Sequence, residues 1–346
     1  MSKSCSIDFR LDRGHLVVTG VGSDSGEQLV QRRGADSVER INDLSGQFLQ
    51  LVVMRSFAEE GDESFMSRLR LLGREIFSFF FDGFEDMVDG CESLRLCHEA
   101  YYLPLEFSFD GTSFLGLKYS IGNWLDSFGP IAGVSPGREE KNYVDMLFLG
   151  GDDRSVWRSL SSSVPSWRCH AVLPLEPGEL FRRLETQRYD IVHLTGHGNF
   201  DENEPEKGFL FVSGRELLGQ GAARLSWDNL RAMRLSQPLV FLNACHSGRV
   251  SSSYRGFVGF ADALLHAGAS SCVTTVWSIS DYTATFFAQE FYDVLSRGGS
   301  LGNAIRDARR ACWVSDPDGS LTGLSYVLFG DPDVRIRGSE AEDDED

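Results

Sequence analysis

From residue 144 to residue 336, short apolar runs alternate with longer amphipathic segments. Apolar runs of about four to eight residues are typical of buried strands, and apolar residues recurring every three or four positions are typical of helices. Their alternation predicts an α/β fold in which helices flank a mostly parallel sheet on both faces. Functional side chains of such a sheet lie at the carboxyl ends of its strands.

The earlier part of the chain has a different pattern. Residues 7–11 and 15–19 predict two strands joined by a turn, and residues 129–142, rich in Gly, Pro and charge, read as a loop or linker.

Over the whole chain, helices are expected at about 37–57, 65–81, 153–162, 178–186, 226–230, 257–266, 282–295 and 301–313. Further strands are expected at 94–97, 119–124, 144–150, 170–173, 191–194, 209–212, 239–242, 272–277, 326–330 and 334–336.

The chain is strongly acidic, with a formal net charge of -18. Much of it lies in residues 337–346, a block of like charge that we expect to be a disordered tail. Nucleic acid is excluded as a direct partner, because phosphate binding needs a basic surface. No run approaches the roughly 20 apolar residues of a membrane span, and residues 1–20 do not resemble a signal peptide. We therefore expect a cytoplasmic protein without a membrane partner.

The seven cysteines form no Cys-x-x-Cys pair. This spacing argues against a disulfide framework and against a zinc site, and reduced thiols are expected. Residues 150–153 read Gly-Gly-Asp-Asp and lack the Lys and Ser/Thr of a phosphate-binding loop. We expect neither a metal nor another cofactor.

Two apolar runs each end at a reactive side chain. Residues 189–194 lead to His197, and residues 238–244 lead to Cys245. Strands of this kind deliver an imidazole and a thiol to one edge of a sheet, which is the pair that a cysteine protease needs. His193 lies inside its apolar run and reads as a core histidine or a neighbour of the site, whereas His246 points away from Cys245.

A series of motifs extends this pattern along much of the chain, from Leu103-Pro104-Leu105-Glu106 to Phe329-Gly330-Asp331-Pro332. Between these lie His197-Gly198, Asn243-Ala244-Cys245-His246-Ser247-Gly248, the segment 268–281 with Trp277 and Asp281, and Gly299-Ser300 followed by Ala304-Ile305-Arg306. The series resembles the CHAT domain family of caspase-like cysteine peptidases, which is more distantly related to separase. In the first motif Leu105 replaces the Trp of the family. The resemblance implies an N-terminal extension at 1–60, a caspase-like peptidase domain at 61–336 and the acidic tail at 337–346.

Membership of that family implies a cysteine endopeptidase that cleaves a partner protein. Cys245 is then the nucleophile and His197 the general acid and base, at a spacing similar to the roughly 50 residues between these groups in caspases. Backbone N–H groups of Gly198 and Cys245 are implied as the oxyanion hole. The family also implies a role in bacterial signalling, antiviral defence or programmed death, with a gasdermin-like effector as one candidate substrate.

Asp281 has two readings. In separase-like relatives an acidic residue after the Trp lines the first specificity pocket, so a buried Asp281 carboxylate would select Arg or Lys. The alternative is that Asp281 caps the helix that begins near Tyr282. Two other functions also stay open, a catalytically silent interaction scaffold and a hydrolase that acts on something other than a peptide.

Overall fold

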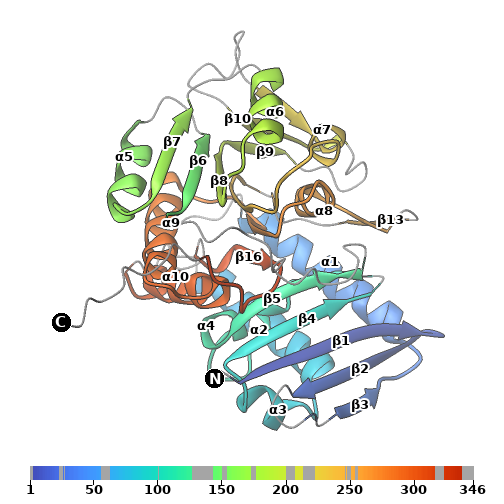
Figure 1. Ribbon diagram of the computed structural model, residues 1–346. Helices are drawn as coiled ribbons and strands as arrows, with labels where there is room; N and C mark the ends of the chain where they lie inside the picture. Colours follow the sequence, from blue (N-terminus) through green and yellow to red (C-terminus); the bar gives the residue numbers. More distant parts are fainter. Residues whose placement is uncertain are drawn as a thin grey trace.

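The computed structural model describes residues 3–22, 26, 28–55, 63–99, 101–126, 143–149, 154–172, 177–199, 207–212, 223–245, 247, 251–253, 256–315 and 323–336. Their centre is an 11-stranded sheet with the order β3-β2-β1-β4-β5-β16-β15-β12-β8-β6-β7 (Figure 1). Its strands are β1 (Ser4–Asp12), β2 (His15–Gly22), β3 (Gln28–Arg32), β4 (Ser93–His98), β5 (Ser120–Leu125), β6 (Asp145–Leu149), β7 (Arg168–Val172), β8 (Ile191–Thr195), β12 (Leu239–Asn243), β15 (Ser271–Thr275) and β16 (Tyr326–Phe329).

The helices are α1 (Ser37–Arg55), α2 (Glu63–Phe81), α3 (Glu85–Asp89), α4 (Leu115–Lys118), α5 (Arg154–Ser163), α6 (Pro177–Thr186), α7 (Trp227–Arg231), α8 (Phe260–His266), α9 (Asp281–Ser296) and α10 (Leu301–Ser315), with a 3₁₀ turn at Leu105–Phe107. A smaller sheet contains β9 (His197–Asn199), β10 (Phe209–Val212) and β11 (Ala223–Ser226), and β13 (Ser251–Ser253) pairs with β14 (Gly256–Val258).

Most neighbouring strands of the large sheet run parallel. β1, β4, β5 and β16 form one parallel series, and β15, β12, β8, β6 and β7 form another. The two series meet where β16 lies antiparallel to β15, and β2 and β3 are antiparallel at one end. The predicted mostly parallel α/β sheet is confirmed.

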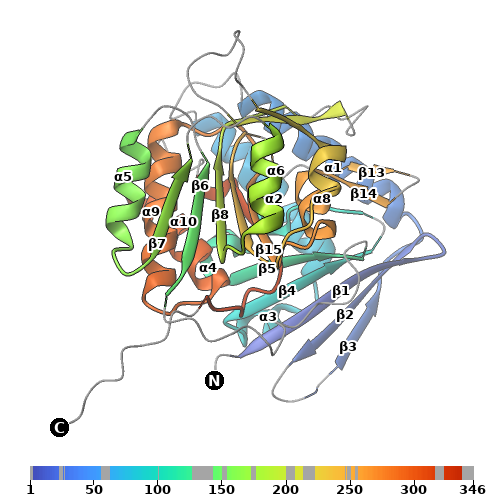
Figure 2. The same ribbon diagram turned by 45° about the horizontal axis from the view of Figure 1, so that its top comes forward.

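Successive strand residues point to opposite faces, and both faces are covered in the second half of the chain. In β12, Leu239 and Phe241 belong to the core that α5, α9 and α10 cover, whereas Val240 and Leu242 belong to the core that α6, α7 and α8 cover. Figure 2 shows α5 and α9 on one side of β6, β7 and β8, and α6 and α8 on the other. An apolar run such as this one is therefore buried on both sides, as parallel strands usually are.

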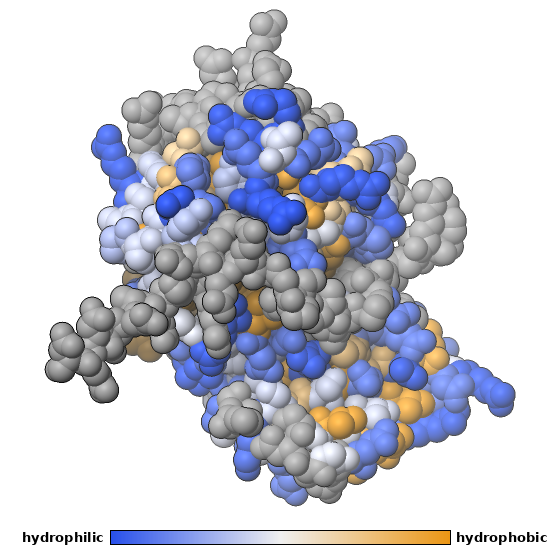
Figure 3. All heavy atoms as spheres, viewed as in Figure 1, coloured by the Kyte–Doolittle hydropathy of each residue, from blue (hydrophilic) through white to orange (hydrophobic). Residues whose placement is uncertain are grey.

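The N-terminal strands share the core of the rest of the chain. Ile7 and Phe9 of β1 are fully buried, and the Phe9 ring contacts Phe80 and Phe81 of α2 at centroid distances of 5.5 and 6.0 Å. The opposite face of β1–β3 carries half-exposed side chains, and Val30 is 56% exposed. Figure 3 shows hydrophobic and hydrophilic residues intermixed over this part of the molecule.

Some sequence predictions were wrong in detail. Residues 334–336 do not add a strand to the large sheet, because Arg335 makes only an isolated bridge to Ser300. Strand β3 and helix α3 were not predicted. The expected loop at 129–142, residues 150–153 and the acidic tail at 337–346 lie outside the described residues.

The prediction that the thiols are all reduced was also wrong. Cys5 at the start of β1 and Cys91 after α3 form a disulfide with a Cα–Cα distance of 6.1 Å. These residues are 86 positions apart, and the pairing of β1 with β4 brings them together. Cys97, Cys169 and Cys245 are partly exposed free thiols, and Cys272 and Cys312 are buried free thiols, as expected for the last two.

The described part of the chain contains neither a candidate membrane-spanning helix nor a candidate metal-binding cluster. None of the helices in this part of the chain has the length and apolar character to cross a membrane. In the same residues, His, Cys, Asp and Glu side chains do not gather in groups of three or more that could hold a metal ion.

Candidate active site

The parallel pairing of β8 with β12 brings the two predicted catalytic residues to one edge of the sheet. Thr195 and Asn243 are the last paired residues, and each reactive residue follows two positions later, as His197 and as Cys245. Beyond the strand ends, the Gly196 N–H donates a hydrogen bond of 3.2 Å to the Asn243 carbonyl oxygen. The two chain segments therefore stay adjacent as they leave the sheet.

Gly198 lies directly against the backbone of Cys245. A Cβ atom placed on Gly198 would overlap the carbonyl oxygen of Cys245 and lie 3.4 Å from the Leu210 side chain. Only glycine fits this approach, because any side chain would push the two segments apart. The His197 side chain is exposed and Cys245 is partly exposed, so both are open to a substrate.

Ala244, Cys245 and Ser247 belong to a turn at the end of β12, which we call the nucleophile turn after the role predicted for Cys245. The Ser247 N–H closes the turn with a hydrogen bond of 3.2 Å to the Ala244 carbonyl oxygen. Among the described residues, the Cys245 N–H donates to no backbone carbonyl. A donor in this position is available to an incoming negative charge.

The strand that leads to this turn is fixed by a buried hydroxyl. Tyr326 of β16 donates a hydrogen bond of 2.7 Å from its hydroxyl to Asn243 Oδ1. Burial raises the pKa of Tyr326 well above its usual value, and the Cys312 and Cys245 thiols act in the same direction. The hydroxyl therefore remains a donor, and it orders β12 two residues before Cys245.

His193 is a core residue, as predicted. Its ring stacks between Phe148 and Phe241 at centroid distances of 5.0 and 4.8 Å, and its nitrogens lie 2.8 Å from the Tyr292 hydroxyl and 3.0 Å from Thr195 Oγ1. Burial lowers the pKa of His193 to about 3, so the ring is neutral near pH 7. Both nitrogens are occupied, which leaves His197 as the candidate acid and base. His246 lies outside the described residues.

The free thiols elsewhere are poorly suited to be nucleophiles. Burial raises the pKa of Cys169 to about 11 and that of Cys272 still further. Burial also raises the pKa of Cys97 to about 12, and the neighbouring Asp8 carboxylate adds to the shift. Since the thiolate is the reactive form, these three residues are inert near neutral pH.

The structure does not fit either predicted role of Asp281 as stated, a buried pocket carboxylate or a helix cap. Its side chain is exposed, so it is not a buried carboxylate at the floor of a pocket. It does not cap α9 either, because Ser280 is the N-cap and its hydroxyl accepts a hydrogen bond of 3.2 Å from the Thr283 N–H. Asp281 is the first residue of α9, at the same edge of the sheet that carries Cys245.

A buried ion pair was not singled out in the sequence. Glu106 and Arg309 are both fully buried, with Oε1 and Nη2 3.7 Å apart, and the Asn123 amide donates to Glu106 Oε1 at 2.6 Å. Arg309 Nε also donates to the Tyr326 carbonyl oxygen at 3.1 Å. Burial raises the pKa of Glu106 and lowers that of Arg309, while their mutual attraction opposes both shifts. The pair therefore joins the Leu103-Pro104-Leu105-Glu106 motif to the strand that supports Asn243.

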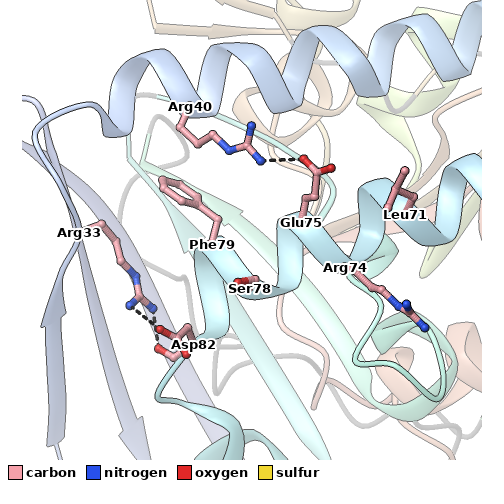
Figure 4. A pocket seen from close by; sticks show the side chains of 8 residues that line it. All are labelled: Arg33, Arg40, Leu71, Arg74, Glu75, Ser78, Phe79 and Asp82. Carbon is pink, nitrogen blue, oxygen red and sulfur yellow. Dashed lines mark hydrogen bonds and ion pairs between the residues drawn. The ribbon is translucent and has the colours of Figure 1, made fainter.

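A hollow of about 420 Å³ lies on a different part of the molecule. It is bounded by α1, α2 and the residues after β3 (Figure 4). Four of its charged residues pair with one another, since Arg40 pairs with Glu75 at 2.7 Å and Arg33 with Asp82 at 3.7 Å. It contains neither His197 nor Cys245, so we do not assign it to the candidate active site.

Comparison with known proteins gives one matching family model and solved structures of similar fold. Residues 170–330, which include both reactive residues, match the family model of the CHAT domain. No curated protein sequence matches the chain. Two crystal structures of the Saccharomyces cerevisiae separase–securin complex, at 2.6 and 3.0 Å resolution, share its fold. The first aligns with a TM-score of 0.57 and 12% identity, and the second with 0.59 and 11%.

Each alignment covers 94% of this chain but only 30% of the matched chain. The chain thus spans less than a third of the length of these relatives. Residues 170–330 thus match the model of the family that the motifs resemble, and the predicted α/β fold, with its large mostly parallel sheet and flanking helices, is confirmed.

Proposed function

We propose that this chain, which carries a CHAT domain at residues 170–330, is a cysteine endopeptidase with a His197–Cys245 dyad. The observation that carries the proposal is the contact of Gly198 with the Cys245 carbonyl group. The residue after His197 lies against the backbone of Cys245, which supports assigning the imidazole and the thiol to one site. A sulfur nucleophile beside a base is the arrangement that acyl transfer requires.

The reaction follows from these groups. His197 accepts the thiol proton, and the Cys245 thiolate attacks the carbonyl carbon of a peptide bond. Charge develops on the carbonyl oxygen, where the backbone N–H groups of Gly198 and Cys245 form the oxyanion hole. His197 then gives its proton to the leaving amine, and water hydrolyses the resulting thioester.

The substrate class in this proposal is a protein cleaved after Arg or Lys. Asp281 supports this choice, because an exposed carboxylate at the catalytic edge can pair with a basic side chain of a bound peptide. The net charge of -18 favours basic substrates in the same sense. The proposed biological setting is bacterial signalling, antiviral defence or programmed death, with a gasdermin-like effector as a candidate substrate.

Covalent labelling tests the proposal. The intact chain is treated with an Arg-containing peptide acyloxymethyl ketone, and the modified peptide is identified by mass spectrometry. We expect an adduct on Cys245 that is lost in Cys245→Ala and in His197→Ala. Cys169→Ala is the matched control, since Cys169 is also a partly exposed free thiol, and it should label like the unmodified chain.

Two results would contradict the proposal. One is cleavage of a protein substrate by folded Cys245→Ala at the original rate. The other is the absence of any Cys245 adduct with Arg-containing, acidic and apolar probes, which would favour a catalytically silent scaffold.

A further inference from the structure

We propose that Thr275 is the positioning residue that fixes the orientation of Cys245, which neither the CHAT motifs nor the sequence patterns indicate. The proposal rests on the cysteine endopeptidase function. Thr275 is the last residue of β15, the strand that lies parallel to β12 in the sheet. It is fully buried, so it does not contact solvent.

Thr275 binds the first residue of the nucleophile turn through its side chain. Its hydroxyl donates a hydrogen bond of 2.7 Å to the Ala244 carbonyl oxygen. The same oxygen accepts the turn-closing hydrogen bond of 3.2 Å from the Ser247 N–H. Both lone pairs of this carbonyl are therefore used, and the peptide group that contains the Cys245 N–H has one orientation.

Thr275 binds the last residue of the same turn through its backbone. Its N–H donates a hydrogen bond of 3.1 Å to Ser247 Oγ, and that hydroxyl donates in turn to the Leu242 carbonyl oxygen at 3.4 Å. One residue of the neighbouring strand thus holds both ends of the turn on which the nucleophile lies. Buried hydrogen bonds of this kind are costly to break, because no water replaces the lost partner.

Thr275 is itself held in place. It is paired with Tyr326 across the β15–β16 ladder, and the following N–H, that of Val276, donates to the Ser325 carbonyl oxygen at 3.0 Å. Tyr326 also binds Asn243. The nucleophile turn is therefore attached to β15 at both ends, and β15 is attached to β16.

Such support matters for catalysis because the ends of the turn set the direction of the Cys245 Sγ and N–H. A displacement of about 1 Å of a reacting group can lower a rate by about 100-fold. Without the Thr275 hydroxyl, the Ala244 carbonyl keeps only the hydrogen bond of the turn itself, and Cys245 is free to turn away from His197.

The test compares Thr275→Val with Thr274→Val. Valine keeps the shape of threonine and removes the hydroxyl in both variants. Thr274 is fully buried too, but its hydroxyl has no hydrogen-bond partner among the described residues, and its side chain lies on the opposite face of β15. It therefore controls for the substitution itself. Thr275→Ser retains the hydroxyl and should restore function.

Two readouts follow each variant. The first is peptide hydrolysis, for which we expect Thr275→Val to lower kcat by about 10- to 100-fold with little change in KM. The second is the rate at which iodoacetamide alkylates Cys245 near neutral pH, which reports the coupling of His197 to the thiol. We expect the alkylation rate of Thr275→Val to fall to that of His197→Ala. The alkylation rates of Thr274→Val and Thr275→Ser should stay within about twofold of the rate of the unmodified chain.

The outcomes separate the two proposals. Equal alkylation rates in the unmodified chain and His197→Ala would contradict the dyad and, with it, the role of Thr275. A rate that depends on His197 but is the same in Thr275→Val and Thr274→Val would leave the peptidase function standing and overturn the role of Thr275. Urea unfolding of each variant shows whether the chain is folded during the assay.

Discussion

Gly198 and Cys245 are in backbone contact, so that no side chain can be placed between the segment that carries the candidate base and the residue that carries the candidate nucleophile. This contact joins β9, in the small sheet, to the carboxyl edge of the large sheet. The geometry of the site therefore depends on a glycine as much as on the two reactive side chains.

The first prediction concerns this glycine. Gly198→Ala should lower kcat/KM by about 100-fold or more, because the new Cβ would overlap the Cys245 carbonyl oxygen and displace the nucleophile. Gly46→Ala is the matched control, since Gly46 lies in α1 and a Cβ there would meet no atom within 4 Å. The control should keep full activity and gain about 0.5–1 kcal/mol of stability from the better helix former. Equal activity of the two variants would show that the contact is dispensable.

The second prediction concerns Asp281. Asp281→Ala should reduce kcat/KM on Arg and Lys peptides more than on apolar ones, because an exposed carboxylate at the catalytic edge is expected to pair with the basic side chain. Asp228→Ala is the control, since Asp228 is an exposed acidic residue in the first turn of α7. Both variants lose the favourable interaction of an acidic side chain with the N-terminus of a helix, which is typically about 0.3–1 kcal/mol. An unchanged preference in Asp281→Ala would remove it from the specificity site.

The third prediction concerns acid stability. Burial lowers the pKa of His98 to about 4 and that of His193 to about 3, whereas a histidine in an unfolded chain titrates near about 6.5. Below about pH 6.5 the unfolded chain takes up protons that these two folded residues do not. The folding free energy contributed by each neutral ring is therefore fully present above about pH 6.5 and is lost as the pH falls toward 4.

Between about pH 7.5 and pH 5 this loss amounts to about 2 kcal/mol per histidine. Urea unfolding at the two pH values measures it. His193→Asn keeps an acceptor near the Tyr292 hydroxyl and removes the titrating ring, so its stability should depend less steeply on pH. An identical slope in this variant would mean that His193 is not the source.

The fourth prediction concerns the disulfide. Reduction of Cys5–Cys91, which closes a loop between residues 86 positions apart, should destabilise the folded chain by about 2–4 kcal/mol. Unfolding by urea with and without a phosphine reductant measures the change, and Cys91→Ser should reproduce it without reductant. If neither the reductant nor Cys91→Ser shifts the urea midpoint of unfolding, the Cys5–Cys91 bond does not stabilise the folded chain.

Features that a local sequence pattern determines could be predicted from the sequence alone. The apolar runs before His197 and Cys245 predicted β8 and β12, and parallel strands necessarily bring their ends to one edge. The turn between β1 and β2 was visible as Asp12-Arg13-Gly14, and both Arg13 and Gly14 have positive φ values, of 49° and 84°. These features depend on residues close together in the chain.

Features that depend on distant residues could not be predicted. The bond between Cys5 and Cys91 requires the β1–β4 pairing, which no spacing rule indicates. The choice between Ser280 and Asp281 as the cap of α9 is a difference of one position between two good capping residues. The support of the nucleophile by Thr275 arises between neighbouring strands that are far apart in sequence, and nothing local marks that threonine.

The place of β16 in the sheet also affects the order of events during synthesis. This strand, the last described strand of the chain, lies between β5 and β15 and joins the two parallel series. A nascent chain on the ribosome displays His197 and Cys245 well before Tyr326 emerges, and until then the hydroxyl that orders Asn243 is missing. In the proposed peptidase, the support of the strand before Cys245 would therefore be complete only after nearly all of the described chain has been translated.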